Sequence, residues 1–192
     1  MIQKVARSTV FTISLIVAAP VATAEEPLRP NVWAVPVAGN IVKNFYQMDE
    51  KVYRSAQPDD EDMEELEELE AFGIREVLNL RLFHTDIDEA KDTKLKLHHV
   101  RMRAGNIEDK DIITSLKYIR DSKGPIVIHC WHGSDRTGVI SAMYRIIYQG
   151  WSKEDATKEL IEGGYGHHDA IYGNIPEYIK GVDVAKIRKS LK

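Results

Sequence analysis

The sequence is poor in cysteine, in glycine and proline, and in excess positive charge. Cys130 is the one cysteine among 192 residues, which excludes an intramolecular disulfide and a zinc site built from several cysteines. With 12 glycines and 7 prolines, the chain is neither collagen-like nor of low complexity. The formal net charge of −4 argues against general nucleic-acid binding, so we expect no nucleic-acid partner. A hydrophobic content of 43% suffices for the core of a single folded domain.

An apolar segment long enough to cross a membrane is also missing near the N-terminus. The apolar stretch of residues 10–19 is shorter than the roughly 20 residues that a membrane span requires. It follows the basic residues Lys4 and Arg7, and it precedes small residues in an A-x-A pattern at 22–24. This layout predicts a secretory signal peptide over residues 1–24, which would make the protein periplasmic or secreted. No stable membrane span would remain after cleavage; an uncleaved membrane anchor is the alternative.

Downstream of the predicted signal peptide, a short proline-containing segment precedes one domain. Residues 25–44 read as a linker or an N-terminal arm, and residues 45–192 as the domain. Hydrophobic patterning predicts strands over 51–54, 74–80, 95–102 and 125–129, and helices over 59–72, 111–120, 137–149, 151–162 and 174–190. The alternation indicates an α/β fold with a central, mostly parallel sheet flanked by helices. The last strand is apolar throughout, which predicts that it is buried on both faces of the sheet.

The residues that follow this buried strand carry the chemistry. The segment 129–138, H-C-W-H-G-S-D-R-T-G, leads from the strand into a helix, and a loop at a helix N-terminus binds anions through free backbone N–H groups. The same field favours the thiolate form of Cys130. Arg136 offers a planar guanidinium that matches the oxygens of a phosphate, and Gly133 lets the backbone close around it. The remaining residues of this candidate phosphate-binding loop are Trp131, His132, Ser134 and Asp135.

The pattern H-C-x5-R-[ST]-G over residues 129–138 resembles the signature loop of the cysteine-dependent protein tyrosine phosphatases. The resemblance implies that Cys130 is the nucleophile and forms a cysteinyl-phosphate, which water then hydrolyses. It implies that Arg136 binds the substrate and stabilises the phosphoryl group in flight, and that Thr137 hydrogen-bonds the sulfur. His129 would help to hold the thiolate form; a buried histidine at the end of a strand is the alternative reading. The family uses no cofactor, and we expect none here.

Three flanking segments narrow the resemblance to one branch of that family. V-Y-R-S-A-Q-P at 52–58, G-I-R-E-V-L-N-L-R at 73–81 and G-G-Y-G at 163–166 are similar to exported bacterial dual-specificity-like phosphatases. The resemblance covers about residues 50–180 and implies the dual-specificity phosphatase fold, with the phosphate-binding loop between a buried strand and a helix. It also implies that the protein acts on phosphorylated protein, on phosphotyrosine and, with dual specificity, on phosphoserine or phosphothreonine. We expect a monomer. Phosphorylated lipids or sugars are alternative substrates, and a non-catalytic phosphate-binding module is an alternative function.

The residue that protonates the leaving group is not where the resemblance places it. The family's general-acid aspartate would fall at about residues 105–106, which are glycine and asparagine. Asp111 is expected to begin a helix and to cap its N–H groups, which would hold it as a carboxylate. Asp109, in the preceding loop, is therefore the predicted general acid. Glu108 and Asp135 are the alternatives.

The seven histidines do not form an obvious metal site. They include the adjacent pairs 98–99 and 167–168, neither of which has the spacing of two ligands on one helix face. We therefore predict no metal, and we interpret these histidines as surface residues or residues at the rim of a pocket.

Export makes a direct prediction about the mature chain. After expression in a Gram-negative host, N-terminal sequencing of the purified protein should begin at Glu25, because signal peptidase cleaves after the A-x-A pattern. Replacing Ala24 with a bulky residue should block this processing and serves as the control. A purified chain that begins at Met1 would contradict the predicted cleavage.

Overall fold

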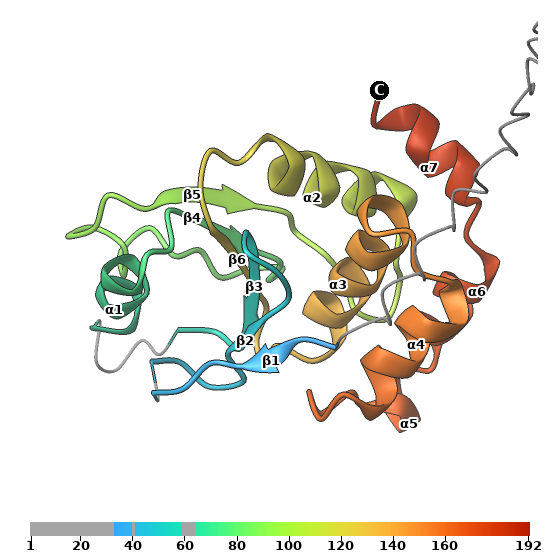
Figure 1. Ribbon diagram of the computed structural model, residues 1–192, viewed down its shortest axis with the longest axis horizontal. Helices are drawn as coiled ribbons and strands as arrows, with labels where there is room; N and C mark the ends of the chain where they lie inside the picture. The colour runs from blue at the N-terminus through green and yellow to red at the C-terminus, as the bar shows by residue number, and fades with distance from the viewer. Residues whose placement is uncertain (1–32, 40, 59–63) are drawn as a thin grey trace, which may run out of the picture. The chain divides into compact units, whose positions relative to one another are not determined.

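The computed structural model describes residues 33–39, 41–58 and 64–192 (Figure 1). The predicted signal peptide and the first residues of the helix predicted over 59–72 lie outside the described residues. The described strands form one sheet in the order β1-β2-β3-β6-β4-β5. Their bounds are β1 (Val35–Pro36), β2 (Tyr46–Gln47), β3 (Val52–Ser55), β4 (Glu76–Asn79), β5 (Lys96–His99) and β6 (Ile126–His129).

Strand β6 lies in the middle of the sheet, as its apolar sequence predicts. It pairs in parallel with β3 on one side and with β4 on the other, and all of its residues are buried. Strand β5 continues the parallel pairing, whereas β1 and β2 are antiparallel at the opposite edge. The carboxyl ends of the four parallel strands therefore meet at one edge, which is where ligands bind in sheets of this kind.

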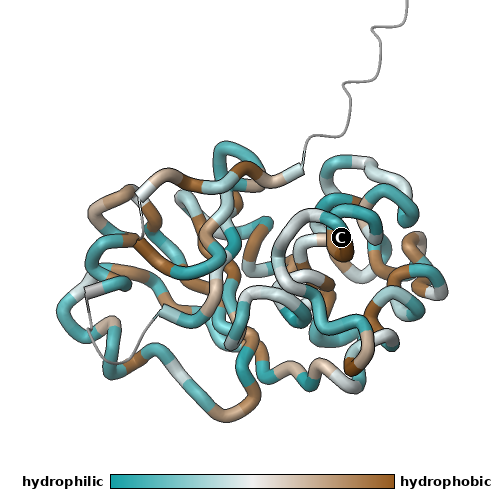
Figure 2. Tube along the Cα trace, turned by 90° about the horizontal axis from the view of Figure 1, so that it is seen from below, coloured by the Kyte–Doolittle hydropathy of each residue, from teal (hydrophilic) through white to brown (hydrophobic). Residues whose placement is uncertain are grey.

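Helices cover both faces of the sheet. Their bounds are α1 (Glu64–Phe72), α2 (Asp109–Asp121), α3 (Asp135–Tyr148), α4 (Lys153–Glu162), α5 (Asp169–Tyr172), α6 (Asn174–Gly181) and α7 (Val184–Ser190). Successive side chains of β6 point to opposite faces: Val127 packs with α1, whereas Ile126 and Ile128 pack with the helices that follow β5. In Figure 2, hydrophobic stretches (brown) recur along the trace in both the left and the right part of the view. Within the described residues, no helix combines the length and the apolar character needed to span a bilayer.

Two helix predictions are wrong in detail. The single helix predicted over 174–190 is divided into α6 and α7, because Val182 is extended and the Asp183 carboxylate accepts a hydrogen bond from Lys186 N at 3.0 Å, which starts a new helix. Helix α2 begins at Asp109 rather than at Asp111, which lies in its first turn and does not cap it. The N-cap position belongs to Glu108, whose side chain makes no capping bond.

The described part of the predicted arm packs on the domain. Strand β1 pairs with β2, and Ala34 N donates to Glu159 Oε1 at 2.7 Å. The same carboxylate accepts two hydrogen bonds of 2.9 Å from the guanidinium of Arg145 in α3. Both side chains are buried. Glu159 therefore links α3, α4 and the described part of residues 25–44.

The buried ion pair gives a prediction for stability. Glu159→Gln keeps the volume of the side chain but leaves the Arg145 charge buried without a counter-charge, so it should lower the free energy of unfolding by about 3–5 kcal/mol. Glu162→Gln is the matched control, because Glu162 pairs with Lys158 at 3.9 Å on the exposed face of the same helix; it should cost less than about 1 kcal/mol. Urea unfolding measures both, and equal effects would contradict the structural role of Glu159.

Candidate active site

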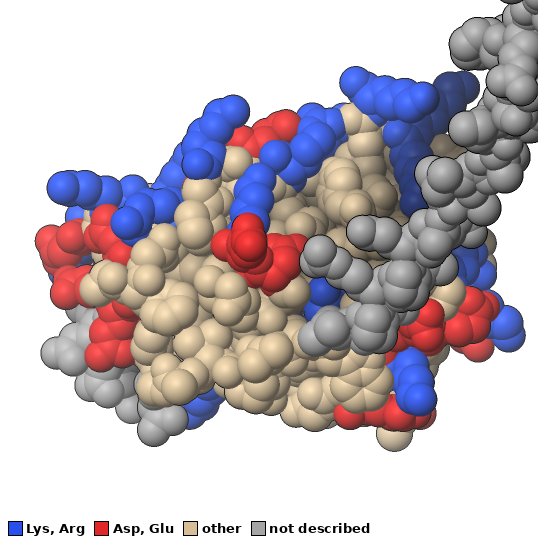
Figure 3. Space-filling model, viewed as in Figure 1, with Lys and Arg blue, Asp and Glu red and all other residues tan. Residues whose placement is uncertain are grey.

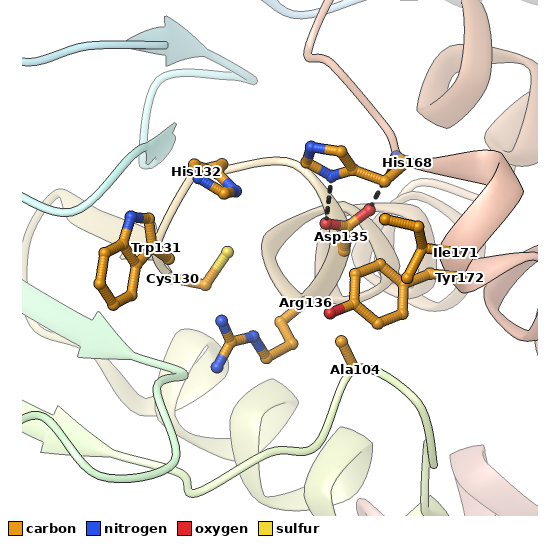
Figure 4. A pocket seen from close by; sticks show the side chains of 9 residues that line it. All are labelled: Ala104, Cys130, Trp131, His132, Asp135, Arg136, His168, Ile171 and Tyr172. Atoms are coloured by element: carbon orange, nitrogen blue, oxygen red, sulfur yellow. Dashed lines mark hydrogen bonds and ion pairs between the residues drawn. The ribbon is translucent and has the colours of Figure 1, made fainter.

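The loop between β6 and α3 lines a pocket at the carboxyl end of the parallel strands. Cys130 is the first residue after β6 and is 2% exposed, and Asp135 begins α3. The pocket has a volume of about 250 Å³. Its lining residues are Ala104, Cys130, Trp131, His132, Asp135, Arg136, His168, Ile171 and Tyr172 (Figure 4). The structure thus brings Cys130 and Arg136 together at the N-terminus of α3, as the motif predicts.

Two of the predicted phosphate-binding residues serve to hold the loop. Gly133 has a φ of +72°, and a Cβ atom at this position would lie 2.4 Å from the carbonyl oxygen of Ser55 in β3. A side chain is therefore excluded both by the backbone conformation and by space. The Ser134 hydroxyl donates to the carbonyl oxygen of Tyr165 at 2.7 Å. These two residues face the protein, whereas Trp131, His132, Asp135 and Arg136 line the pocket.

A fully buried arginine, which the sequence did not single out, lies under the loop. Arg54 of β3 donates from Nη2 to the carbonyl oxygen of Gly133 at 2.7 Å, and its guanidinium lies 3.7 Å from the ring centre of Tyr165. Burial lowers the pKa of Arg54 to about 10, which still leaves it charged near neutral pH. A charged residue within a wholly buried strand is the signal that sequence reasoning could have used.

A second buried group fixes the other end of the loop. The ring of His129 is fully buried; its Nε2 lies 2.9 Å from Asp86 Oδ2, and its Nδ1 lies 3.3 Å from the carbonyl oxygen of Cys130. Burial is the largest influence and tends to raise the pKa of Asp86, but the interactions with His129, Gln57 and His84 together outweigh it and lower that pKa. His129 is therefore both a buried histidine at a strand end and a support for the nucleophile's backbone. Asp86 lies in the loop after β4, where no motif marks it.

Two polar groups in the first turn of α3 are available to a ligand. Arg136 Nη1 lies 3.4 Å from the carbonyl oxygen of Leu80, but its buried Nε has no hydrogen-bond partner among the described residues. The hydroxyl of Thr137 is fully buried and also lacks a partner there. Buried N–H and O–H groups of this kind are costly unless something satisfies them, which suits an anion bound by the loop.

Asp109, the predicted general acid, does not line the pocket. Its Oδ2 accepts from Lys186 Nζ at 2.7 Å and its Oδ1 from the Tyr178 hydroxyl at 2.9 Å, which ties α2 to α7 and α6. The bond from Lys186 lowers the pKa of Asp109, which favours the carboxylate over the form that carries a proton. In Figure 3, Lys and Arg side chains (blue) lie along the top of the view, in the region where Figure 1 places α2 and α7. The alternative Glu108 pairs with Lys110 at 2.7 Å.

Comparisons of the sequence with known proteins agree with this geometry. The model of the tyrosine phosphatase family matches residues 41–168. The dual specificity protein phosphatase TpbA of Pseudomonas aeruginosa is 31% identical over 167 residues, which cover 85% of this chain and 72% of TpbA.

Comparisons of the structure find the same relative. A crystal structure of P. aeruginosa TpbA superposes with a TM-score of 0.73 at 29% identity and covers 84% of this chain and 97% of that one. A TpbA variant in complex with pTyr gives a TM-score of 0.73 at 28% identity over 85% of this chain and 98% of the other. The catalytic domain of the PP-IP phosphatase SIW14 from S. cerevisiae shares the fold, with a TM-score of 0.65 at 24% identity over 77% of this chain and 90% of that one.

The contact between Gly133 and β3 gives a prediction for the loop. Gly133→Ala should push the loop away from Ser55, and a displacement of about 1 Å in a site of this kind costs on the order of 10²-fold in activity. Gly105→Ala is the matched control, because a Cβ atom at Gly105 meets no atom within 4 Å. Steady-state kinetics with p-nitrophenyl phosphate, together with circular dichroism to confirm folding, would test this. A Gly133→Ala variant as active as Gly105→Ala would contradict the tight approach.

Proposed function

Since this chain belongs to the tyrosine phosphatase family, we propose that it is an enzyme that hydrolyses phosphotyrosine in proteins through a phosphoryl intermediate on Cys130. The observation that carries the proposal is the position of Cys130 in the wall of a pocket that Arg136 also lines, in the loop that leads into the N-terminus of α3. A non-catalytic phosphate-binding module would need the anion site but not a thiol within it. Relatedness to a dual specificity phosphatase extends the proposal to phosphoserine and phosphothreonine.

The geometry supports a two-step reaction. In the first step the Cys130 sulfur attacks phosphorus, the bond from phosphorus to the tyrosine oxygen breaks, and that oxygen takes a proton. The N–H groups of the loop and the guanidinium of Arg136 stabilise the charge on the transferring phosphoryl group. In the second step water attacks phosphorus, the phosphorus–sulfur bond breaks, and phosphate leaves. Thr137, whose hydroxyl is buried next to the loop, would stabilise the departing thiolate.

The surroundings of the pocket favour a phosphotyrosine side chain on a polypeptide. Trp131, Ile171 and Tyr172 give the pocket largely apolar walls, which suit an aromatic ring above the phosphate. A second cavity of about 340 Å³ shares Trp131 and His132 with the pocket and has Lys43 and Arg81 in its lining, so it offers room and positive charge for residues that flank the phosphotyrosine. The guanidinium of Arg81 lies 4.3 Å from the ring centre of Trp131.

We extend the proposal to localisation. A periplasmic or secreted phosphatase follows from the predicted signal peptide, and its substrates would be proteins outside the cytoplasm. A monomer is the proposed state.

Replacement of the nucleophile tests the proposed function. Cys130→Ser should reduce turnover of a phosphotyrosine peptide to below about 1% of wild type, because a hydroxyl is a much weaker nucleophile than a thiolate. Binding of the same peptide should persist, because the backbone N–H groups of the loop are unchanged. Turnover is measured by phosphate release and binding by calorimetry. Residual activity well above this level would exclude Cys130 as the nucleophile.

A further inference from the structure

The reaction needs a proton donor, and Asp109 is not among the residues that line the pocket. The departing tyrosine oxygen takes up a proton, and general acid catalysis contributes about 10²–10⁴-fold to such steps. Residues 104–106, next to the pocket, have no acidic side chain. Apart from the nucleophile and Arg136, the titratable side chains that line the pocket are His132, Asp135, His168 and Tyr172.

Asp135 is occupied as a hydrogen-bond acceptor at both oxygens. Its Oδ1 lies 2.9 Å from His167 Nδ1 and receives the backbone N–H of His168 at 3.0 Å. Its Oδ2 lies 2.8 Å from His168 Nδ1 (Figure 4). The carboxylate is also buried, with 5% of the residue exposed. It therefore accepts from two imidazoles rather than donating a proton to a substrate.

The two histidines differ in what the second ring nitrogen meets. The side chain of His167 is 1% exposed, and its buried Nε2 has no hydrogen-bond partner among the described residues. A proton on that nitrogen would be a buried N–H without an acceptor, so His167 is best satisfied as the neutral tautomer with its proton on Nδ1. The side chain of His168 is 38% exposed and lines the pocket. Since Asp135 binds Nδ1 of His168, the nitrogen that faces away from the carboxylate is Nε2 (Figure 4).

A buried carboxylate behind an imidazole fixes the orientation of the ring and stabilises its protonated form. We propose that His168 is the general acid of the reaction, positioned by Asp135. The proposal rests on the proposed function. In the first step the Nε2–H of the imidazolium transfers its proton to the tyrosine oxygen as the bond from that oxygen to phosphorus breaks. In the second step neutral Nε2 accepts a proton from the attacking water, which restores the imidazolium and the thiolate.

Other charged or titratable groups also face His168. Asp135 is the neighbouring carboxylate, and the ring of His132 lies 5.2 Å away between centroids. Tyr172 of α5 lies 6.4 Å away, with its ring perpendicular to that of His168. Cys130 and Arg136 lie in the other walls of the same pocket. Because His132 also titrates, variants at His168 and His132 are compared in the pH experiment.

Leaving-group dependence separates a proton donor from a structural residue. In rapid-mixing experiments, His168→Gln should slow the first turnover of a phosphotyrosine peptide about 10²-fold. The first turnover of p-nitrophenyl phosphate should change far less, because its leaving group needs no proton. His167→Gln is the matched control, because His167 contacts the other oxygen of the Asp135 carboxylate. This variant should not change the ratio of the first-turnover rates on the two substrates.

The pH dependence gives a second readout. The decline of kcat at alkaline pH for phosphotyrosine should flatten in His168→Gln. It should move to lower pH in Asp135→Asn, which keeps the imidazole but removes the carboxylate behind it, and it should persist unchanged in His132→Gln. An equal loss on both substrates in His168→Gln would overturn the proposal, as would a selective loss in Asp109→Asn instead. A wild-type enzyme that hydrolyses p-nitrophenyl phosphate but not phosphotyrosine would contradict the proposed function, an outcome visible before any variant is made.

Discussion

A buried positive charge holds the phosphate-binding loop in its active shape. The guanidinium of Arg54 is removed from water beneath the loop, where it binds the carbonyl oxygen of Gly133 and lies against the ring of Tyr165. Such a charge is tolerated because these partners compensate for part of its lost hydration. A shift of the loop would break the bond between Gly133 and Arg54 and leave the buried charge with one partner fewer, so this contact holds the loop in place.

The same constraint connects the core to the pocket. The hydroxyl of Tyr165 donates to Glu159 at 3.1 Å, and Glu159 is the buried partner of Arg145 in α3. The carbonyl oxygen of Tyr165 accepts a hydrogen bond from the hydroxyl of Ser134 in the loop. The segment that carries Tyr165 continues directly into His167 and His168, so the fold that positions the nucleophile also positions the proposed proton donor. Thiol, guanidinium and imidazole thus depend on one network of buried polar contacts.

Local patterns explain what the sequence could predict. The apolar run of β6 and the motif after it are contiguous, so the central strand, the loop and the pair Cys130 and Arg136 were correctly placed. The break between α6 and α7 occurs where the Asp183 side chain caps α7. The spacing of hydrophobic residues does not predict such a cap. The sequence predicts Asp109 as the acid from its place in the chain, but its partners lie on α6 and α7, about 70 residues or more away. The contacts of Asp135 with His168 likewise exist only in the folded chain.

The central claim is that phosphate passes through the Cys130 sulfur. The most direct measurement is rapid acid quenching of the wild-type enzyme during turnover of a phosphotyrosine peptide, followed by mass spectrometry of the peptides that contain Cys130. The account predicts a phosphoryl group on Cys130 that forms as fast as tyrosine is released and then decays. Turnover without a phosphoryl group on Cys130, or with the group on another residue, would contradict it.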